Sequence, residues 1–155
     1  MDRYDAPTTS GDLAFSLLTL GGLRLAVPQA DIDTLEPAAD IDPASPPPHG
    51  IGWIRLGRQR WPVFCLNGEL RPRSERPADH GTCAVLNAGG HAIALLCTDV
   101  SLLHLPAAGL APLPPAMALP GRPIRGLAQM DGAVLCLSSA RDLAEYVKTM
   151  IYETH

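Results

Sequence analysis

The stretch LTLGGLRLAVPQADIDTL at residues 18–35 is echoed by LNAGGHAIALLCTDVSLL at residues 86–103. At a constant offset, the two glycines of the first stretch fall on two glycines of the second, and Asp31 falls on Asp99. Apolar positions near the ends of the stretches also coincide, so shared composition alone does not explain the match. An internal repeat of this kind indicates one supersecondary unit that has been duplicated.

Each copy is followed by the same kinds of segment. A proline-rich passage leads to a glycine-containing segment and then to an apolar strand that carries a cysteine, VFCL at residues 63–66 and VLCL at residues 134–137. Short apolar segments separated by glycine turns are typical of antiparallel strands. The sequence therefore predicts a mainly β fold with two similar β subdomains, from approximate repeats at residues 13–70 and 82–137.

The first copy predicts three strands. Residues 13–20 and 23–27 form a hairpin around the Gly-Gly turn, and a third strand follows in which Ile32 and Leu35 are expected to point inward. In the second copy, the long apolar strand at residues 91–97 favours burial on both of its faces or a bulged barrel strand.

Length and composition describe a compact globular chain. Its 155 residues, 46% of them hydrophobic and 18% charged, are enough to bury a substantial core. Residues 1–12 are polar and predict a flexible tail, without the basic-then-apolar order of a secretory signal. No uncharged apolar run approaches the roughly 20 residues needed to span a bilayer. We therefore expect a cytoplasmic protein without membrane insertion.

One long helix is predicted at residues 139–152. Ser139 precedes Asp142 at the spacing of a capping box. The apolar residues that follow recur at helical spacing, so the helix has one apolar face. We expect this face to pack on the β core, and a partner-binding helix is the alternative. The apolar residues are Leu143, Tyr146, Val147, Met150 and Ile151.

The motifs of common enzymes and metal sites are missing from the sequence. There is no P-loop, G-x-S-x-G or H-E-x-x-H pattern, and the four cysteines lie in apolar runs without a C-x-x-C pair. Buried thiols behave as small hydrophobic groups. Asp31 and Asp33 are interpreted as the solvated face of a strand rather than as cation ligands. We expect no catalytic residues, no metal and no cofactor.

Arginines concentrate between residues 55 and 76, although the formal net charge is -4. Lysine is nearly absent and few aromatic residues could stack on bases, so nucleic acid is not an expected partner. Arg55 and Arg58 flank a predicted turn close to Trp61, and arginine and tryptophan are enriched at binding hot spots. A protein-binding turn and an ordinary basic turn are equally open. A rival hypothesis is a small anion-binding, nucleotide-binding or cysteine-dependent protein that uses this basic segment.

With these features in place, the chain resembles the CheW-like domain family of bacterial chemosensory adaptors from about residue 13 to residue 146. The resemblance rests on four segments: FSLLTLGGLRLAVP, IDTLEP, GWIRLGRQRWPVFCL and GLAQMDGAVLCLSSARDL. It implies two SH3-like five-stranded β-barrel subdomains that share a core and carry a C-terminal α-helix. Residues 13–150 would form a single domain.

The resemblance also implies a function. Proteins of this family are non-enzymatic adaptors that join the regulatory domain of a CheA-type histidine kinase to the cytoplasmic helical tip of chemoreceptors. A cytoplasmic chain of this kind would be recruited to membrane-bound receptor arrays. The partner-binding residues that the resemblance implies are Ile32, Thr34, Trp53, Arg55, Leu56, Gly57 and Arg58.

The chain departs from the family at two of these places. Family members typically carry Asn-Leu-Arg-Gly in the central turn, where this chain has Arg-Leu-Gly-Arg at residues 55–58, and they often carry a glutamate at the position of Thr34. The chain thus resembles a divergent adaptor, one that serves a type IV pilus or another alternative chemosensory system.

Overall fold

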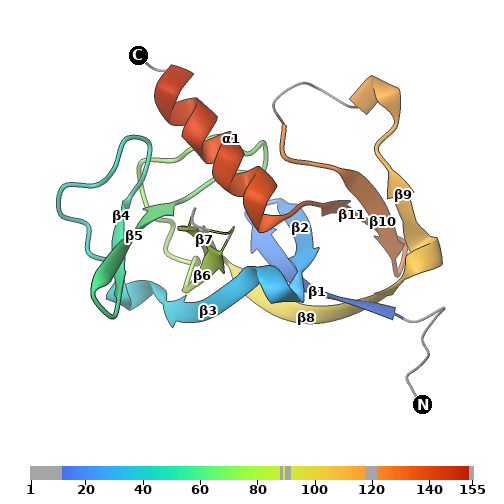
Figure 1. Ribbon diagram of the computed structural model, residues 1–155, viewed down its shortest axis with the longest axis horizontal. Helices are drawn as coiled ribbons and strands as arrows, with labels where there is room; N and C mark the ends of the chain where they lie inside the picture. Colours follow the sequence, from blue (N-terminus) through green and yellow to red (C-terminus); the bar gives the residue numbers. More distant parts are fainter. Residues whose placement is uncertain (1–11, 88, 90–91, 118–121, 154–155) are drawn as a thin grey trace.

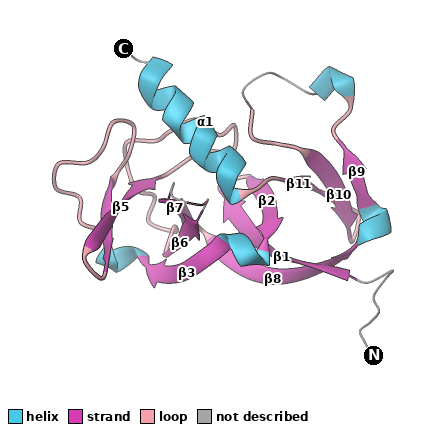
Figure 2. Cartoon of the chain, in the orientation of Figure 1, coloured by secondary structure: helices cyan, strands magenta, loops and turns pink. Residues whose placement is uncertain are grey.

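The computed structural model describes residues 12–87, 89, 92–117 and 122–153. Of the tail predicted at residues 1–12, only Asp12 is among the described residues. Gly90 and His91 also lie outside them. The described chain forms two curved β-sheets side by side, with one α-helix, α1 (Ala140–Glu153), lying across them (Figure 1). Strands predominate throughout (Figure 2), so the predicted mainly β class with a C-terminal helix is confirmed.

The first sheet has six strands and the second has five. In both, most neighbours are antiparallel, and each sheet has one parallel pair. The first sheet has the order β8 (Asp99–Pro106), β1 (Asp12–Leu20), β2 (Leu23–Pro28), β11 (Ala133–Leu137), β10 (Gly126–Met130) and β9 (Leu110–Pro112). The second has the order β3 (Ile32–Pro37), β6 (Thr82–Asn87), β7 (Ala92–Cys97), β5 (Gln59–Phe64) and β4 (Gly52–Leu56).

The two repeats are interleaved, because each sheet takes strands from both. The first sheet combines β1 and β2 with β8, β10 and β11, whereas the second combines β6 and β7 with β3, β4 and β5. If each strand is replaced by its counterpart in the other repeat, the order β8-β1-β2-β11-β10 becomes β3-β6-β7-β5-β4, which is the order observed. The duplication therefore gives two equivalent five-stranded units related by exchange of strands.

Each sheet curls until its ends meet. After β3 and a short 3-10 helix, η2 (Ala38–Asp40), the backbone of Asp42 makes two hydrogen bonds with Trp53 on β4, of 2.7 and 2.8 Å. The second repeat does the same: after β8 and η3 (Ala107–Gly109), Ala111 of β9 pairs with Leu127 of β10. These contacts close two half-barrels.

The half-barrels share a hydrophobic core. Phe15 and Leu135 belong to a cluster inside the first, and Ile54 and Val63 to a cluster inside the second. Strand β7 contributes to two clusters, since its alternate residues lie on opposite faces, which confirms the predicted burial of both faces. The central cluster includes Leu18, Leu20, Leu25, Val27, Phe64, Leu86, Ile93, Leu95, Leu143 and Val147.

One prediction about β3 was wrong. Ile32 packs against the central cluster as expected, but Leu35 is 46% exposed. Exposure along β3 alternates residue by residue, and Ile32 and Leu35 are three positions apart, so they lie on different faces. The prediction that both point inward did not respect this alternation.

Helix α1 packs its apolar face on the central cluster through Leu143 and Val147. Ser139 caps the helix as predicted, because its Oγ accepts a hydrogen bond of 3.1 Å from the Asp142 backbone N–H. The Ala140 backbone N–H donates to Asp31 Oδ2 at 2.9 Å. Asp31 is therefore a helix cap, in contrast to the solvated strand residue predicted from the sequence. The side chain of Ile151 lies outside the described residues.

Candidate partner-binding surface

The hairpin of β4 and β5 has one apolar face and one basic face. Strand residues alternate between faces, so Ile54 and Val63 point into the half-barrel while their neighbours point outward. The register sets Trp53 opposite Pro62 and Arg55 opposite Arg60 on the outer face. We call Trp53, Arg55, Arg58, Arg60 and Pro62 the basic hairpin face.

Trp53 is fixed in place on this face. Its indole N–H donates a hydrogen bond of 2.8 Å to the backbone oxygen of Ser45, in the loop that leads to β4. The Arg60 guanidinium lies over the ring, with Cζ 4.5 Å from the ring centroid. This is cation–π geometry, which holds a charged side chain and an aromatic ring in one arrangement. The hairpin thus presents an ordered aromatic and cationic pair.

The other predicted residues of the hairpin divide between surface and interior. Arg55 and Arg58 are exposed, and Gly57 begins the two-residue turn with a φ of 61°, a conformation that favours glycine. Leu56 is half-buried and packs against the cluster inside the half-barrel. The hairpin therefore brings the predicted residues together. Leu56 differs from the others because it lies on the inner side of the hairpin, against the core of the half-barrel.

Ile32 and Thr34 lie on β3, at the other end of the strand order of the same sheet. Both are half-buried, and Thr34 Oγ1 donates a hydrogen bond of 2.7 Å to Glu36 Oε2. The predicted residues thus form two groups, one on β3 and one on the β4–β5 hairpin.

Sequence reasoning missed two members of the basic hairpin face, Arg60 and Pro62. The signal was available in part, because Arg60 and Pro62 are the two neighbours of Trp61, and the neighbours of an inward-facing strand residue lie on the outer face. The backbone oxygen of Ser45, which anchors Trp53, could not be found in this way because its position depends on the path of a proline-rich loop.

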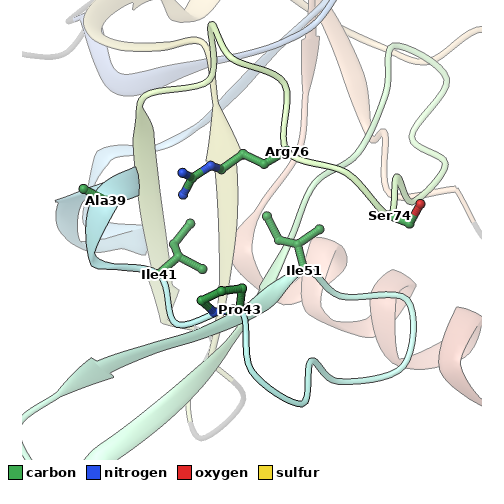
Figure 3. A pocket seen from close by; sticks show the side chains of 6 residues that line it. All are labelled: Ala39, Ile41, Pro43, Ile51, Ser74 and Arg76. Carbon is green, nitrogen blue, oxygen red and sulfur yellow. The ribbon is translucent and has the colours of Figure 1, made fainter.

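A hollow of about 320 Å³ lies beside this loop (Figure 3). Its wall is mixed, with the apolar side chains of Ile41 and Ile51 at its centre and the polar side chains of Ser74 and Arg76 beside them. The Arg76 guanidinium reaches over them and donates a hydrogen bond of 2.7 Å to the backbone oxygen of Ala38. The cationic group in the hollow is thus already bonded within the protein, where it links two loops. This leaves it little capacity to bind an anion. The rival hypothesis of an anion site in the basic segment gains no support here.

The cysteines are poor nucleophiles in this fold. Cys65, Cys83 and Cys97 are buried, and Cys136 is half-buried. Burial raises the pKa of each thiol above its usual value, to about 12 for Cys83, where the nearby Glu36 carboxylate adds to the effect. A thiol reacts as the thiolate, which is scarce at neutral pH when the pKa is this high. Within the described residues, no three His, Cys, Asp or Glu side chains gather as a metal site.

The fold and surface together define a class of protein: a β scaffold of two half-barrels with an exposed basic hairpin as its most distinctive surface. The family model of the CheW-like domain matches residues 14–147. The chain belongs to the CheW-like domain family, whose members are non-enzymatic scaffolding adaptors of chemotaxis.

Comparison with solved structures agrees on the fold. The chain is similar to the scaffolding protein TtCheW from Thermoanaerobacter tengcongensis, with a TM-score of 0.64 and 15% sequence identity. The similarity covers 82% of this chain and 88% of TtCheW. A search of curated proteins gave no match.

Among the described residues, no helix has the length and apolar character needed to cross a membrane.

Proposed function

We propose that this protein is an adaptor that couples a CheA-type histidine kinase to the cytoplasmic helical tip of chemoreceptors. Family membership supports an adaptor role. The basic hairpin face gives the strongest support. Arg60 is stacked there on Trp53, which is anchored by a hydrogen bond, and Arg55 and Arg58 are exposed beside this pair. Ordered aromatic and arginine side chains on a surface are typical of binding hot spots.

In this proposal the two groups of residues serve two partners. The hairpin residues Trp53, Arg55 and Arg58 contact the regulatory domain of the kinase, while Ile32 and Thr34 on β3 contact the receptor. The two groups lie on different strands, which supports simultaneous binding, because one partner need not cover the strand that the other uses.

The proposal extends to location and pathway. The protein acts in the cytoplasm and is recruited to membrane-bound receptor arrays by its partners. The central turn, Arg-Leu-Gly-Arg at residues 55–58, differs from the usual turn of the family. This difference favours a kinase of a divergent system, such as one that controls a type IV pilus.

Copurification from native cells tests the proposal. The protein would be tagged at its N-terminus, purified at moderate salt, and its partners identified by mass spectrometry against an untagged control. We expect recovery of a CheA-type kinase, a chemoreceptor, or both. Reproducible recovery of an unrelated protein without either would show that the fold has been kept while the function has changed.

A further inference from the structure

Arg55 and Arg60 form a pair of like charges on the basic hairpin face. They lie directly opposite each other in the antiparallel register, and both are exposed. Like charges in such positions are destabilising. Within the described part of the chain, neither side chain is bonded to a carboxylate, and Arg58 in the turn adds a third exposed charge. The hairpin therefore carries positive charge that the rest of the described chain leaves uncompensated.

The equivalent hairpin of the other repeat shows that the fold does not need these arginines. The counterpart of Arg55 is Gln129, and the counterpart of Arg60 is Val134, which pairs with Gln129 across β10 and β11. The turn there contains Asp131 in place of Gly57. The same backbone thus forms with no arginine at any of these positions.

The arrangement suits carboxylate groups better than nucleic acid. A guanidinium that is stacked on a ring keeps its N–H groups free at its edge, and its planar fork matches a carboxylate. Nucleic-acid binding relies on many cationic contacts with phosphates, whereas this chain has a net charge of -4 and a single lysine, Lys148.

We propose that the basic hairpin face binds a carboxylate-rich surface of a partner protein. This inference deepens the proposed function by naming the chemistry of the partner at the hairpin, and its test does not depend on the kinase. Arg60, held over Trp53, and Arg55 and Arg58 beside it receive aspartate or glutamate side chains. The positive face in an otherwise acidic protein also orients such a partner as it approaches.

The test is a titration of the full-length protein with a hexaglutamate peptide, followed by the ¹H–¹⁵N signals of the two indole groups. The chain has two tryptophans, and they report on different places. Trp53 lies on the basic hairpin face, whereas the Trp61 indole nitrogen is buried. We expect a saturable shift of the Trp53 signal, no shift of the Trp61 signal, and a weaker effect as salt is raised.

The variant Arg55→Glu/Arg58→Glu keeps Trp53 and Arg60 themselves but reverses the charge beside them, and we expect its affinity for the peptide to fall about tenfold or more. A matched control, Arg24→Glu/Arg141→Glu, makes the same change of net charge at two exposed arginines outside the hairpin. We expect it to bind as the wild type does. The neutral variant Arg55→Gln/Arg58→Gln repeats the test if charge reversal impairs folding.

Several outcomes would overturn the inference. These are an unmoved Trp53 signal, equal losses in the hairpin variant and the matched control, or a stronger response to a short oligothymidylate than to hexaglutamate. The last result would identify a nucleic-acid site. Failure to recover either a kinase or a chemoreceptor in the copurification would count against the proposed function alone.

Discussion

Arg55 is the residue whose replacement should separate binding from folding. Its side chain is exposed and faces Arg60 across the hairpin. In Arg55→Glu the like-charge pair becomes an opposite-charge pair, so we expect the melting temperature to stay level or rise slightly. Binding to the kinase regulatory domain should weaken, because truncating or reversing a hot-spot residue costs about 2 kcal/mol or more.

Calorimetry with the purified kinase domain measures the binding, and thermal unfolding measures stability. Arg24→Glu serves as the control, since Arg24 is also exposed but lies on β2. Unchanged kinase binding by Arg55→Glu would contradict the assignment of the hairpin.

Gly52 is the residue where the second half-barrel leaves no room for a side chain. A Cβ at this position would overlap the backbone oxygen of Asp42, whose hydrogen bonds with Trp53 close the half-barrel. We expect Gly52→Ala to lower the free energy of unfolding by about 1–3 kcal/mol, because a rigid backbone atom must move. Chemical denaturation measures this change.

The control for this substitution is Gly22→Ala. Gly22 lies in the β1–β2 turn, and a Cβ there would meet no atom within 4 Å. Its effect should stay within about 0.5 kcal/mol. Equal effects of the two substitutions would show that general glycine propensity, rather than the close approach to Asp42, sets the cost. In the other repeat, Gly126 has the same role, since its Cβ would lie 2.6 Å from the backbone oxygen of Ala111.

At the scale of the element, the start of helix α1 depends on a residue far away in sequence. Asp31 accepts the hydrogen bond of the Ala140 backbone N–H, one of the groups that a helix cannot satisfy internally. We expect Asp31→Ala to lower the free energy of unfolding by about 1 kcal/mol, the usual cost of losing a cap. The comparison is with Asp33→Ala, by chemical denaturation.

Asp33 is the natural control because it is exposed on β3, two residues from Asp31. Its removal should change the free energy of unfolding little. If the two variants lost the same stability, the cap would not explain the role of Asp31, and a general effect of negative charge in this segment would be favoured.

Local patterns were sufficient to predict most elements. The Gly-Gly and central turns, the apolar strands and the Ser139–Asp142 cap all follow from neighbouring residues, and all are present. The exposure of Leu35 was predictable, because it lies three residues from Ile32 and strand residues alternate between faces. The role of Asp31 was not, since its partner is 109 residues away in the chain.

At the scale of the whole molecule, the repeat did not reveal which strands pair with which. The two copies have nearly the same pattern, so β3 could pair with β1 of its own repeat or with β6 of the other, and the hydrophobic faces would be satisfied either way. In the structure β3 pairs with β6 and β8 pairs with β1. The candidate residues on the hairpin were proposed through the family resemblance, whereas the stacking of Arg60 on Trp53 required the three-dimensional structure.

Because of this exchange, we propose that residues 13–150 unfold as one domain. The central cluster joins both sheets, so neither half-barrel keeps its core alone. Both tryptophans belong to the second sheet and report on its unfolding. Phe15 is 8% exposed and lies in the first half-barrel, and we expect Phe15→Ala to cost about 3–5 kcal/mol.

The full loss in free energy of unfolding caused by Phe15→Ala should be measured by tryptophan fluorescence, although both tryptophans are in the other half-barrel. Circular dichroism should give the same midpoint, as a two-state transition requires. A fluorescence midpoint that stayed at the wild-type value, with a separate earlier transition by circular dichroism, would show two independent domains.

We propose that the protein bridges a kinase and a receptor. The most direct measurement is a sedimentation assay with receptor signalling domains displayed on vesicles, the purified kinase regulatory domain, and this protein added in increasing amounts. We expect the kinase domain to sediment only when the protein is present, and Arg55→Glu to sediment with the receptor but to leave the kinase domain in solution. Kinase sedimentation that did not depend on the protein, or binding of the protein to neither partner, would contradict it.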